Sequence, residues 1–155
     1  MENFECRFCR CKIDQVFVDL GISPLSNAFL TKKDLKELEK RFPLKAFVCK
    51  NCFLVQLPEF ETPENIFSDY VYFSSYSKSW LKHVENYVDM ISEKIKLEKD
   101  NLVVELASND GYLLQFFKKK GIPVKGIEPA ANVAKVAENK GIETIVEFLG
   151  EKLAK

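Results

Sequence analysis

The sequence lacks an excess of charge of either sign. Its 155 residues hold 23 Lys and Arg against 23 Asp and Glu, so the formal net charge at pH 7 is zero. A chain without a basic surplus offers no overall electrostatic reason to bind nucleic acid or an anionic membrane surface. Partners must therefore be inferred from local sites, and we expect neither nucleic acid nor a membrane among them.

Long apolar runs and histidine are also scarce. The chain nowhere approaches the ~18 consecutive apolar residues of a membrane span, and its first residues show no basic start followed by an apolar stretch. These absences predict a cytoplasmic protein. The only histidine, His83, lies among polar neighbours in a helical pattern, so we expect an exposed helix residue rather than a catalytic one.

The sequence pattern changes between Pro58 and Pro63. Before this point, short segments with alternating apolar residues predict strands and turns. Thr31 is expected to begin a short peripheral helix with Leu35 and Leu38 on its buried side. We predict that residues 1–60 form one small domain.

Longer periods follow the boundary. Residues 61–100 contain a tyrosine-rich segment and then one long amphipathic helix, expected over roughly Ser77 to Lys96. Residues 101–155 alternate strands and helices in the order β-α-β-α-β, which implies a parallel, doubly wound sheet with right-handed crossovers. Three strands do not complete such a sheet, and one edge would stay bare. We therefore expect an α/β protein whose second domain is truncated.

Four of the five cysteines form two Cys-x-x-Cys pairs, Cys6 with Cys9 and Cys49 with Cys52. Two such turns supply the tetrahedral four-thiolate sphere that zinc accepts. Four sulfurs leave no open position for water or substrate, so the pattern predicts structural zinc. A redox dithiol is the alternative, although redox pairs usually occur singly. Cys11 is left over, either as a competitor of Cys9 or as a thiol beside the site.

A polar turn, Glu105-Leu-Ala-Ser-Asn-Asp-Gly111, follows the first strand of the predicted parallel sheet, where open α/β sheets bind ligands. A dinucleotide fold would need Gly-x-Gly-x-x-Gly, whereas this turn has one glycine and Asp110, which would repel a phosphate. A cofactor with a positive sulfonium and no phosphate tolerates an acidic turn. Glu128 at the next strand end is placed to accept both ribose hydroxyls. The turn predicts S-adenosylmethionine rather than NAD, with a simple acidic helix cap as the alternative.

Together these motifs resemble the zinc-containing class I methyltransferases that C-methylate nucleotide-linked keto sugars. The resemblance covers nearly the whole chain and rests on the two cysteine pairs with segments 25–29, 67–76, 104–111 and 126–132. It departs at Cys11, where glycine is expected. It implies a small four-cysteine zinc-binding domain followed by an incomplete Rossmann-like methyltransferase sheet. It also implies a chain more than twice as long, so this chain would lack the sugar-binding part and the catalytic base.

The resemblance implies a site and a reaction. A proton α to a ketone is removed from the nucleotide-linked keto sugar, and the enolate carbon then takes the sulfonium methyl group. Tyr72 and Tyr76 are candidates for reaching the cofactor or the sugar ketone, with packing as the equal alternative. The residues expected to bind the cofactor are Glu105, Ala107, Ser108, Asn109, Gly111, Glu128, Pro129 and Asn132.

Two other interpretations stay open. The first is a zinc-knuckle module that binds protein or nucleic acid without enzymatic activity. Residues 1–60 hold ten Lys and Arg against eight Asp and Glu, with no basic cluster along an aromatic face, so nucleic acid is weakly supported. The second is an unusually short NAD-dependent or sugar-nucleotide enzyme, which the unfinished sheet and the missing phosphate loop argue against.

Overall fold

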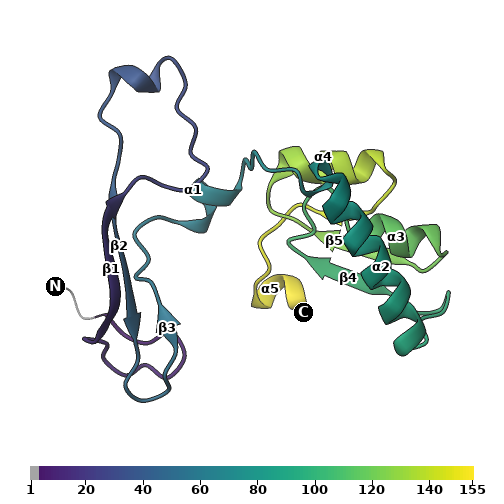
Figure 1. The fold of residues 1–155 in the computed structure, drawn as a ribbon, viewed down its shortest axis with the longest axis horizontal. Coiled ribbons are helices and arrows are strands. Elements are labelled where there is room, and N and C mark those ends of the chain that lie inside the picture. The colour runs from purple at the N-terminus through teal and green to yellow at the C-terminus, as the bar shows by residue number, and fades with distance from the viewer. Residues whose placement is uncertain (1–3) are drawn as a thin grey trace. The chain divides into compact units, whose positions relative to one another are not determined.

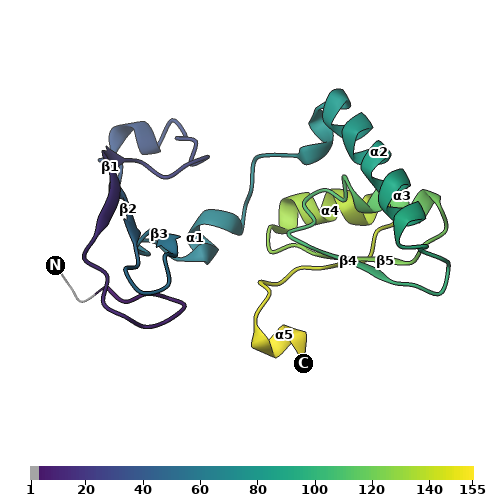
Figure 2. The ribbon, with the colours of Figure 1, turned by 60° about the horizontal axis from the view of Figure 1, so that its bottom comes forward.

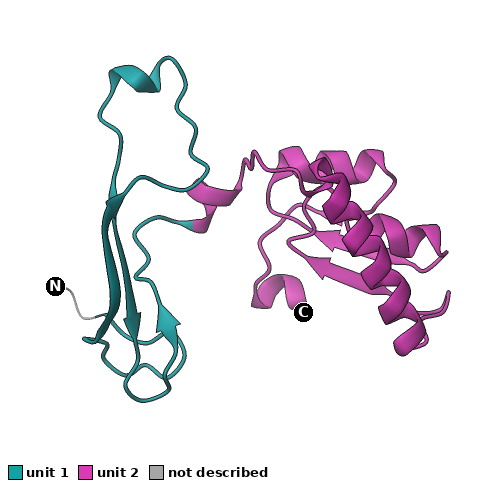
Figure 3. Ribbon diagram, viewed as in Figure 1, with its two compact units in different colours: residues 1–62 teal, residues 63–155 magenta. Residues whose placement is uncertain are grey.

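A computed structural model of the chain describes residues 4–155. The protein divides into two compact units, Met1–Thr62 and Pro63–Lys155 (Figure 3). An antiparallel sheet forms the first unit and a parallel sheet with helices forms the second, so the α/β fold class is confirmed (Figure 1). Within residues 4–155, no helix is long and apolar enough to cross a bilayer.

The first unit is built on three antiparallel strands in the order β1-β2-β3. They are β1 (Val16–Ser23), β2 (Phe42–Val48) and β3 (Val55–Gln56). Every residue of β1 except the last is exposed, so the sheet buries little apolar surface by itself. The buried core consists instead of Cys6, Ile13 and Cys49. The cysteine cluster is therefore the centre around which this unit is organised.

The helix expected from Thr31 is wrong. Only one 3-10 turn, η1 (Asp34–Lys36), forms there, and Leu35 and Leu38 are 69% and 97% exposed. The Leu35 N–H donates to the Thr31 carbonyl at 3.1 Å and the Thr31 hydroxyl donates to the Asp34 carboxylate at 2.6 Å, so one turn does form after Thr31. The backbone is extended again at Glu37, because two exposed leucines give no buried face to sustain further turns.

The second unit begins with α1 (Pro63–Phe67), the 3-10 turn η2 (Ser74–Tyr76) and α2 (Lys78–Lys94). The long helix is confirmed, and the Ser77 hydroxyl caps it by accepting from the Trp80 N–H at 3.2 Å. Its buried residues Val84 and Val88 pack in one core with aromatic residues of the next helix. This packing attaches α2 to the sheet domain.

The predicted β-α-β-α-β order is confirmed. It comprises β4 (Val103–Leu106), α3 (Leu114–Lys119), β5 (Val124–Ile127), α4 (Ala131–Asn139) and β6 (Thr144–Ile145), followed by α5 (Glu151–Ala154). The strands are parallel and lie in the order β4-β5-β6. Figure 2 shows α2, α3 and α4 on one side of β4 and β5. On the opposite face Val104 and Leu106 are 47% and 52% exposed, and the described helices leave them uncovered.

Candidate functional site

Four cysteine sulfurs converge in the first unit. The Sγ atoms of Cys6 and Cys52 lie 3.6 Å apart, and those of Cys9 and Cys49 lie 3.5 Å apart. All four lie within 4.8 Å of one another, and none is in a disulfide. Tetrahedral zinc with bonds of about 2.3 Å places its sulfurs about 3.8 Å apart. The arrangement therefore fits a four-thiolate zinc ion, and the structure brings together the four cysteines that the spacing selects.

Both cysteine pairs lie on turns of the same form. The Arg10 N–H donates to the Cys6 carbonyl at 2.9 Å, and the Phe53 N–H donates to the Cys49 carbonyl at 2.9 Å. Arg10 and Phe53 each have φ of +62°, which lets the chain turn back sharply around the two sulfurs. The left-handed residue of the first turn is thus Arg10, so Cys11 in place of the expected glycine leaves the turn intact.

The surroundings of the four thiols differ. A backbone hydrogen bond from Cys9 lowers the pKa of Cys6 to about 6, although burial opposes this shift. For Cys52, the Leu54 backbone acts to lower the pKa, but burial and hydrogen bonds with the other three sulfurs raise it to about 12. Four adjacent thiolates repel one another, so full ionisation needs a cation among them.

Gln56 contacts this cluster from β3. Its side chain is buried, its Nε2 donates to the Cys6 Sγ at 3.3 Å, and its Oε1 accepts from the Arg7 N–H at 3.0 Å. The bond from Arg7 fixes which end of the amide faces the sulfur, so the donor end meets Cys6. Sequence reasoning missed Gln56, because nothing in the local pattern places β3 beside the first cysteine turn.

In the second unit, the turn after β4 has a strained backbone. Ala107, Asn109 and Gly111 have φ of +57°, +49° and +73°. This conformation suits glycine and is tolerated by asparagine, but it costs a residue such as alanine about 1–2 kcal/mol. Strained backbone of this kind concentrates at ligand sites, where the surrounding structure holds it. The turn predicted to approach a cofactor is therefore sharply bent.

Glu128 joins this turn to the end of β5. Its Oε2 accepts from the Asn109 N–H at 2.9 Å, and its Oε1 accepts from the Ala130 N–H at 2.9 Å. The residue is only 6% exposed. A carboxylate has about four acceptor positions, so both oxygens keep capacity for further donors. Glu128 is thus held rigidly at the sheet edge and can still accept hydroxyl groups.

A cavity of 480 Å³ opens at the carboxyl ends of the parallel strands. Its volume falls in the range of about 300–1,000 Å³ that is usual for small-molecule sites. The cofactor candidates that line it are Ala107, Asn109, Glu128 and Pro129, and other lining residues include Tyr72, Tyr112, Glu147 and Phe148. The remaining candidates, Glu105, Ser108, Gly111 and Asn132, lie outside the lining. Sequence reasoning missed Tyr112 and Glu147.

Two further carboxyl groups, those of Glu105 in β4 and Asp110 in the turn that follows it, lie outside the cavity lining. Burial raises the pKa of Glu105 to about 8, the Tyr112 hydroxyl opposes the shift by hydrogen bonding, and the neighbouring charges of Glu128 and Asp110 add to it. One oxygen of Glu105 and one of Asp110 are buried without a hydrogen-bond partner among the described residues. The cavity lining itself holds Glu128 and Glu147 and no lysine or arginine among the described residues, so it favours a ligand that brings positive charge.

The two candidate catalytic tyrosines are placed differently. Tyr72 lines the cavity and is 52% exposed, whereas Tyr76 is 91% exposed and lies outside the lining. His83 is exposed on α2 and stacks on Trp80 with ring centroids 5.3 Å apart. Neither His83 nor Tyr76 thus has a described contact with the cavity.

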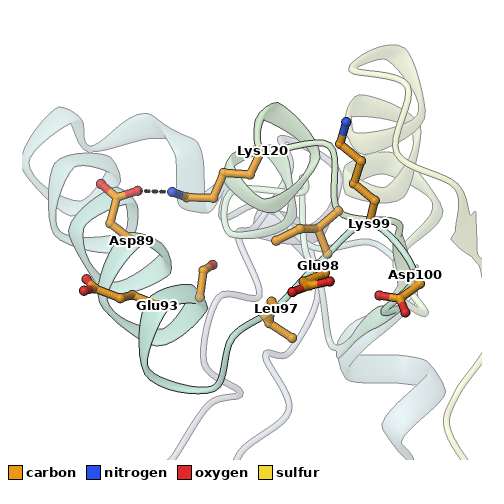
Figure 4. Close-up of a pocket in the computed structure, with 9 residues that line it drawn as sticks. Asp89, Glu93, Leu97, Glu98, Lys99, Asp100 and Lys120 are labelled. Atoms are coloured by element: carbon orange, nitrogen blue, oxygen red, sulfur yellow. Dashed lines mark ion pairs between the residues drawn. The ribbon is translucent and has the colours of Figure 1, made fainter.

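A larger hollow of 850 Å³ lies at the other end of the strands (Figure 4). It is formed by the end of α2 and by the segments that lead into β4 and β5, whereas parallel sheets bind ligands at their carboxyl ends. Its walls carry both signs of charge, and Asp89 and Lys120 already pair across it at 2.6 Å. The smaller cavity beside Glu128 is therefore the better candidate site.

Comparisons with known proteins agree with these features. Residues 6–67 match the Methyltransf_13 family, described as "Putative zinc binding domain". The chain is 38% identical over 154 residues to the C-methyltransferase NovU of Streptomyces niveus. That alignment covers 97% of this chain and 37% of NovU, so the chain spans just over a third of its relative. Residues 6–67 are thus similar to the zinc-binding domain that this family describes, in a chain that is similar in sequence to a C-methyltransferase.

Proposed function

We propose that this chain provides the zinc-binding domain and the cofactor site of an S-adenosylmethionine-dependent C-methyltransferase. Its substrate is a nucleotide-linked keto sugar, methylated at a carbon next to the ketone. The sequence relation to NovU supports the reaction class, and the motif resemblance supports the sugar substrate. The reaction belongs to the whole enzyme, of which this chain corresponds to one part.

The observation that carries the cofactor assignment is the acidic lining of the cavity, which holds Glu128 and Glu147 and no lysine or arginine among the described residues. Glu128 is 6% exposed and accepts two backbone N–H groups, and Glu147 lines the same cavity. A pyrophosphate would add charge of the same sign. S-adenosylmethionine brings an ammonium and a sulfonium and no phosphate, so its charge complements the site. This argument disfavours NAD.

The residues of the chain have distinct tasks in this proposal. Glu128 is fixed by two backbone N–H groups and accepts the ribose hydroxyls with its remaining lone pairs. The bent turn at Ala107 and Asn109 brings backbone close to the ligand. Tyr72 offers a phenol at the cavity wall for an oxygen of the cofactor or the sugar. S-adenosylmethionine supplies the methyl group when it is bound.

Zinc has a structural task in the same proposal. Cys6, Cys9, Cys49 and Cys52 hold it through four thiolates and leave no position for substrate. The ion connects residues 6–9 with residues 49–52 and replaces the apolar core that the first unit lacks. Five free thiols agree with a reducing compartment, and we place the protein in the cytoplasm.

Calorimetric titration with S-adenosylhomocysteine, S-adenosylmethionine and NAD tests the cofactor assignment. We expect the two adenosyl ligands to bind and NAD not to bind. Glu128→Gln should weaken binding about 10- to 100-fold, because it removes a charged acceptor. Glu138→Gln, an exposed change on α4, is the matched control and should bind normally. Tighter binding of NAD would overturn the proposal, and binding of none of the three ligands would favour the binding-module alternative.

Metal analysis tests the zinc assignment independently. We expect one zinc ion per chain after purification without added metal. Cys49→Ser should lose it, whereas Cys11→Ser should keep it, because Cys11 lies outside the four-sulfur cluster. A Cys49→Ser protein that retained a full equivalent of zinc would refute the four-thiolate site.

A further inference from the structure

The segment before α2 runs beside the cofactor cavity and has little regular structure of its own. We name residues 70–76 the strap. Tyr70, Tyr72 and Ser74 of the strap line the cavity, and only its last three residues form a 3-10 turn. Backbone groups of an irregular segment must find partners outside it when they are withdrawn from water. The sheet domain supplies those partners.

Two asparagines grip the strap backbone. The Asn132 Nδ2 donates to the Tyr70 carbonyl at 2.7 Å, and its Oδ1 accepts from the Tyr70 N–H at 3.1 Å. The Asn109 Nδ2 donates to the Tyr72 carbonyl at 3.0 Å, and its Oδ1 accepts from the Ser74 N–H at 2.9 Å. Each amide thus pairs with main chain as a neighbouring strand would.

A third anchor lies at the far end of the strap. The Lys140 Nζ donates to the Ser75 Oγ at 2.9 Å and to the Asp110 carbonyl at 2.7 Å. The Asp110 Oδ2 accepts from the Ser75 N–H at 3.3 Å and lies 3.4 Å from the same ammonium. The Asp110 side chain is 2% exposed, so this ion pair is shielded on the acid side. Lys140 follows α4 and has no place in the cavity lining.

We propose that Asn132, Asp110 and Lys140 are positioning residues that fix the strap as one wall of the cofactor cavity. The inference rests on the proposed cofactor site. Both polar atoms of the Asn132 side chain are used on Tyr70, and none of the three residues lines the cavity. They act on the ligand through the placement of Tyr70, Tyr72 and Ser74. Asn132, which the motif predicts to bind the cofactor, would therefore act indirectly, by holding the backbone of Tyr70.

Lys140→Met tests this role at the residue farthest from the ligand. It removes the ammonium and keeps most of the side-chain stem. We expect S-adenosylhomocysteine to bind about tenfold more weakly in calorimetry, a change of about 1.4 kcal/mol. Hydrogen exchange should become faster at the strap amides. Lys135→Met is the matched control, because Lys135 contacts only exposed Glu138 in the described structure, and it should change neither quantity.

Asn132→Asp is the second variant. It keeps the shape of the side chain but turns an acceptor toward the Tyr70 carbonyl, so binding should weaken and strap exchange should rise as for Lys140→Met. Lys140→Arg should restore part of the affinity. Lys140→Met leaves the buried Asp110 side chain without its cation, so the unfolding midpoint reported by Trp80 fluorescence should also fall, and binding is compared at a temperature where each variant is fully folded.

The outcomes separate the two proposals. If the native chain binds no S-adenosylhomocysteine, the proposed function fails and the wall assignment falls with it. If the native chain binds and both variants bind equally well while their straps exchange faster, the cofactor site stands and the positioning role is overturned. Weaker binding together with faster strap exchange, in variants that are fully folded at the titration temperature, supports it.

Discussion

Gly111 is the single glycine of the turn after β4, and its position is tightly constrained. Its φ is +73°, and a Cβ placed there would overlap the Ile142 Cδ1 and lie 3.2 Å from the Ala137 Cβ. Both neighbours are buried, at 1% and 0% exposure, in the core that supports the turn. Gly111→Ala therefore combines a backbone penalty with overpacking.

Two other glycines of the same unit separate these contributions. Gly121 has φ of +77° but only an ordinary contact, 3.5 Å from the Lys99 Cε, so Gly121→Ala should cost about 1–2 kcal/mol for the backbone alone. A Cβ at Gly126 would overlap the Ser108 Oγ in extended strand backbone, so Gly126→Ala should cost about 1–3 kcal/mol for packing alone. Their sum predicts about 2–5 kcal/mol for Gly111→Ala.

Urea unfolding monitored by tryptophan fluorescence measures the free energy of unfolding for all three variants, whose substitutions lie in the second unit. Trp80 is the only tryptophan and stacks on Tyr112, with centroids 6.2 Å apart, in the second unit. The free energy of unfolding should fall least for Gly121→Ala and most for Gly111→Ala. A Gly111→Ala protein no less stable than Gly121→Ala would refute the tight contact of the turn with Ile142 and Ala137.

Three further predictions concern single side chains. The folded-state pKa of Glu105 is about 8, above its ordinary value of 4.5, so its contribution to stability is lost as pH rises from about 4.5 to about 8. Glu105→Gln should flatten this loss when the free energy of unfolding is measured between pH 4.5 and 8.5. An unchanged pH slope would contradict the burial of this carboxyl group. Gln56→Leu should weaken zinc binding about tenfold in competition with a chromophoric chelator, because it removes a hydrogen-bond donor to the Cys6 sulfur. Gln15→Leu, at an exposed position, is its control. Equal zinc affinities of the two variants would contradict a role for this hydrogen bond. Asn109→Gly should keep the left-handed turn but remove the side chain that binds the strap, so hydrogen exchange at the Ser74 amide should become faster. Unchanged exchange would show that the Asn109 side chain does not hold the strap.

Local patterns predicted those parts of the fold that depend on neighbours in sequence. The spacing of Cys6 and Cys9 selects a metal ligand pair, because one turn brings both sulfurs to one ion. Ser77 and the apolar period after it define α2 almost to the residue. The same reasoning was wrong at Thr31, where one turn forms but no helix follows, because Leu35 and Leu38 are exposed and do not pack against the rest of the unit.

Contacts between distant segments could not be predicted in this way. Gln56 meets Arg7 across 49 positions, and Asn132 meets Tyr70 across 62. An asparagine in a motif offers a donor and an acceptor, but the pattern does not say whether a ligand or a backbone amide will take them. The sequence thus indicated the turn that borders the cavity and left open which of its side chains would face a ligand.

Asn109 shows why this turn departs from a glycine-rich form. Glycine would adopt the φ of +49° without strain, yet it has no side chain to hold the strap. Alanine at this position would have the strained backbone conformation and would also lack the hydrogen bonds to the strap. Asparagine tolerates the left-handed conformation, and its side-chain amide forms hydrogen bonds with the backbone of Tyr72 and Ser74. Its N–H meanwhile orients Glu128. One residue thereby couples the turn, the strap and the carboxylate proposed to hold the ribose, which a phosphate-binding glycine loop has no need to do.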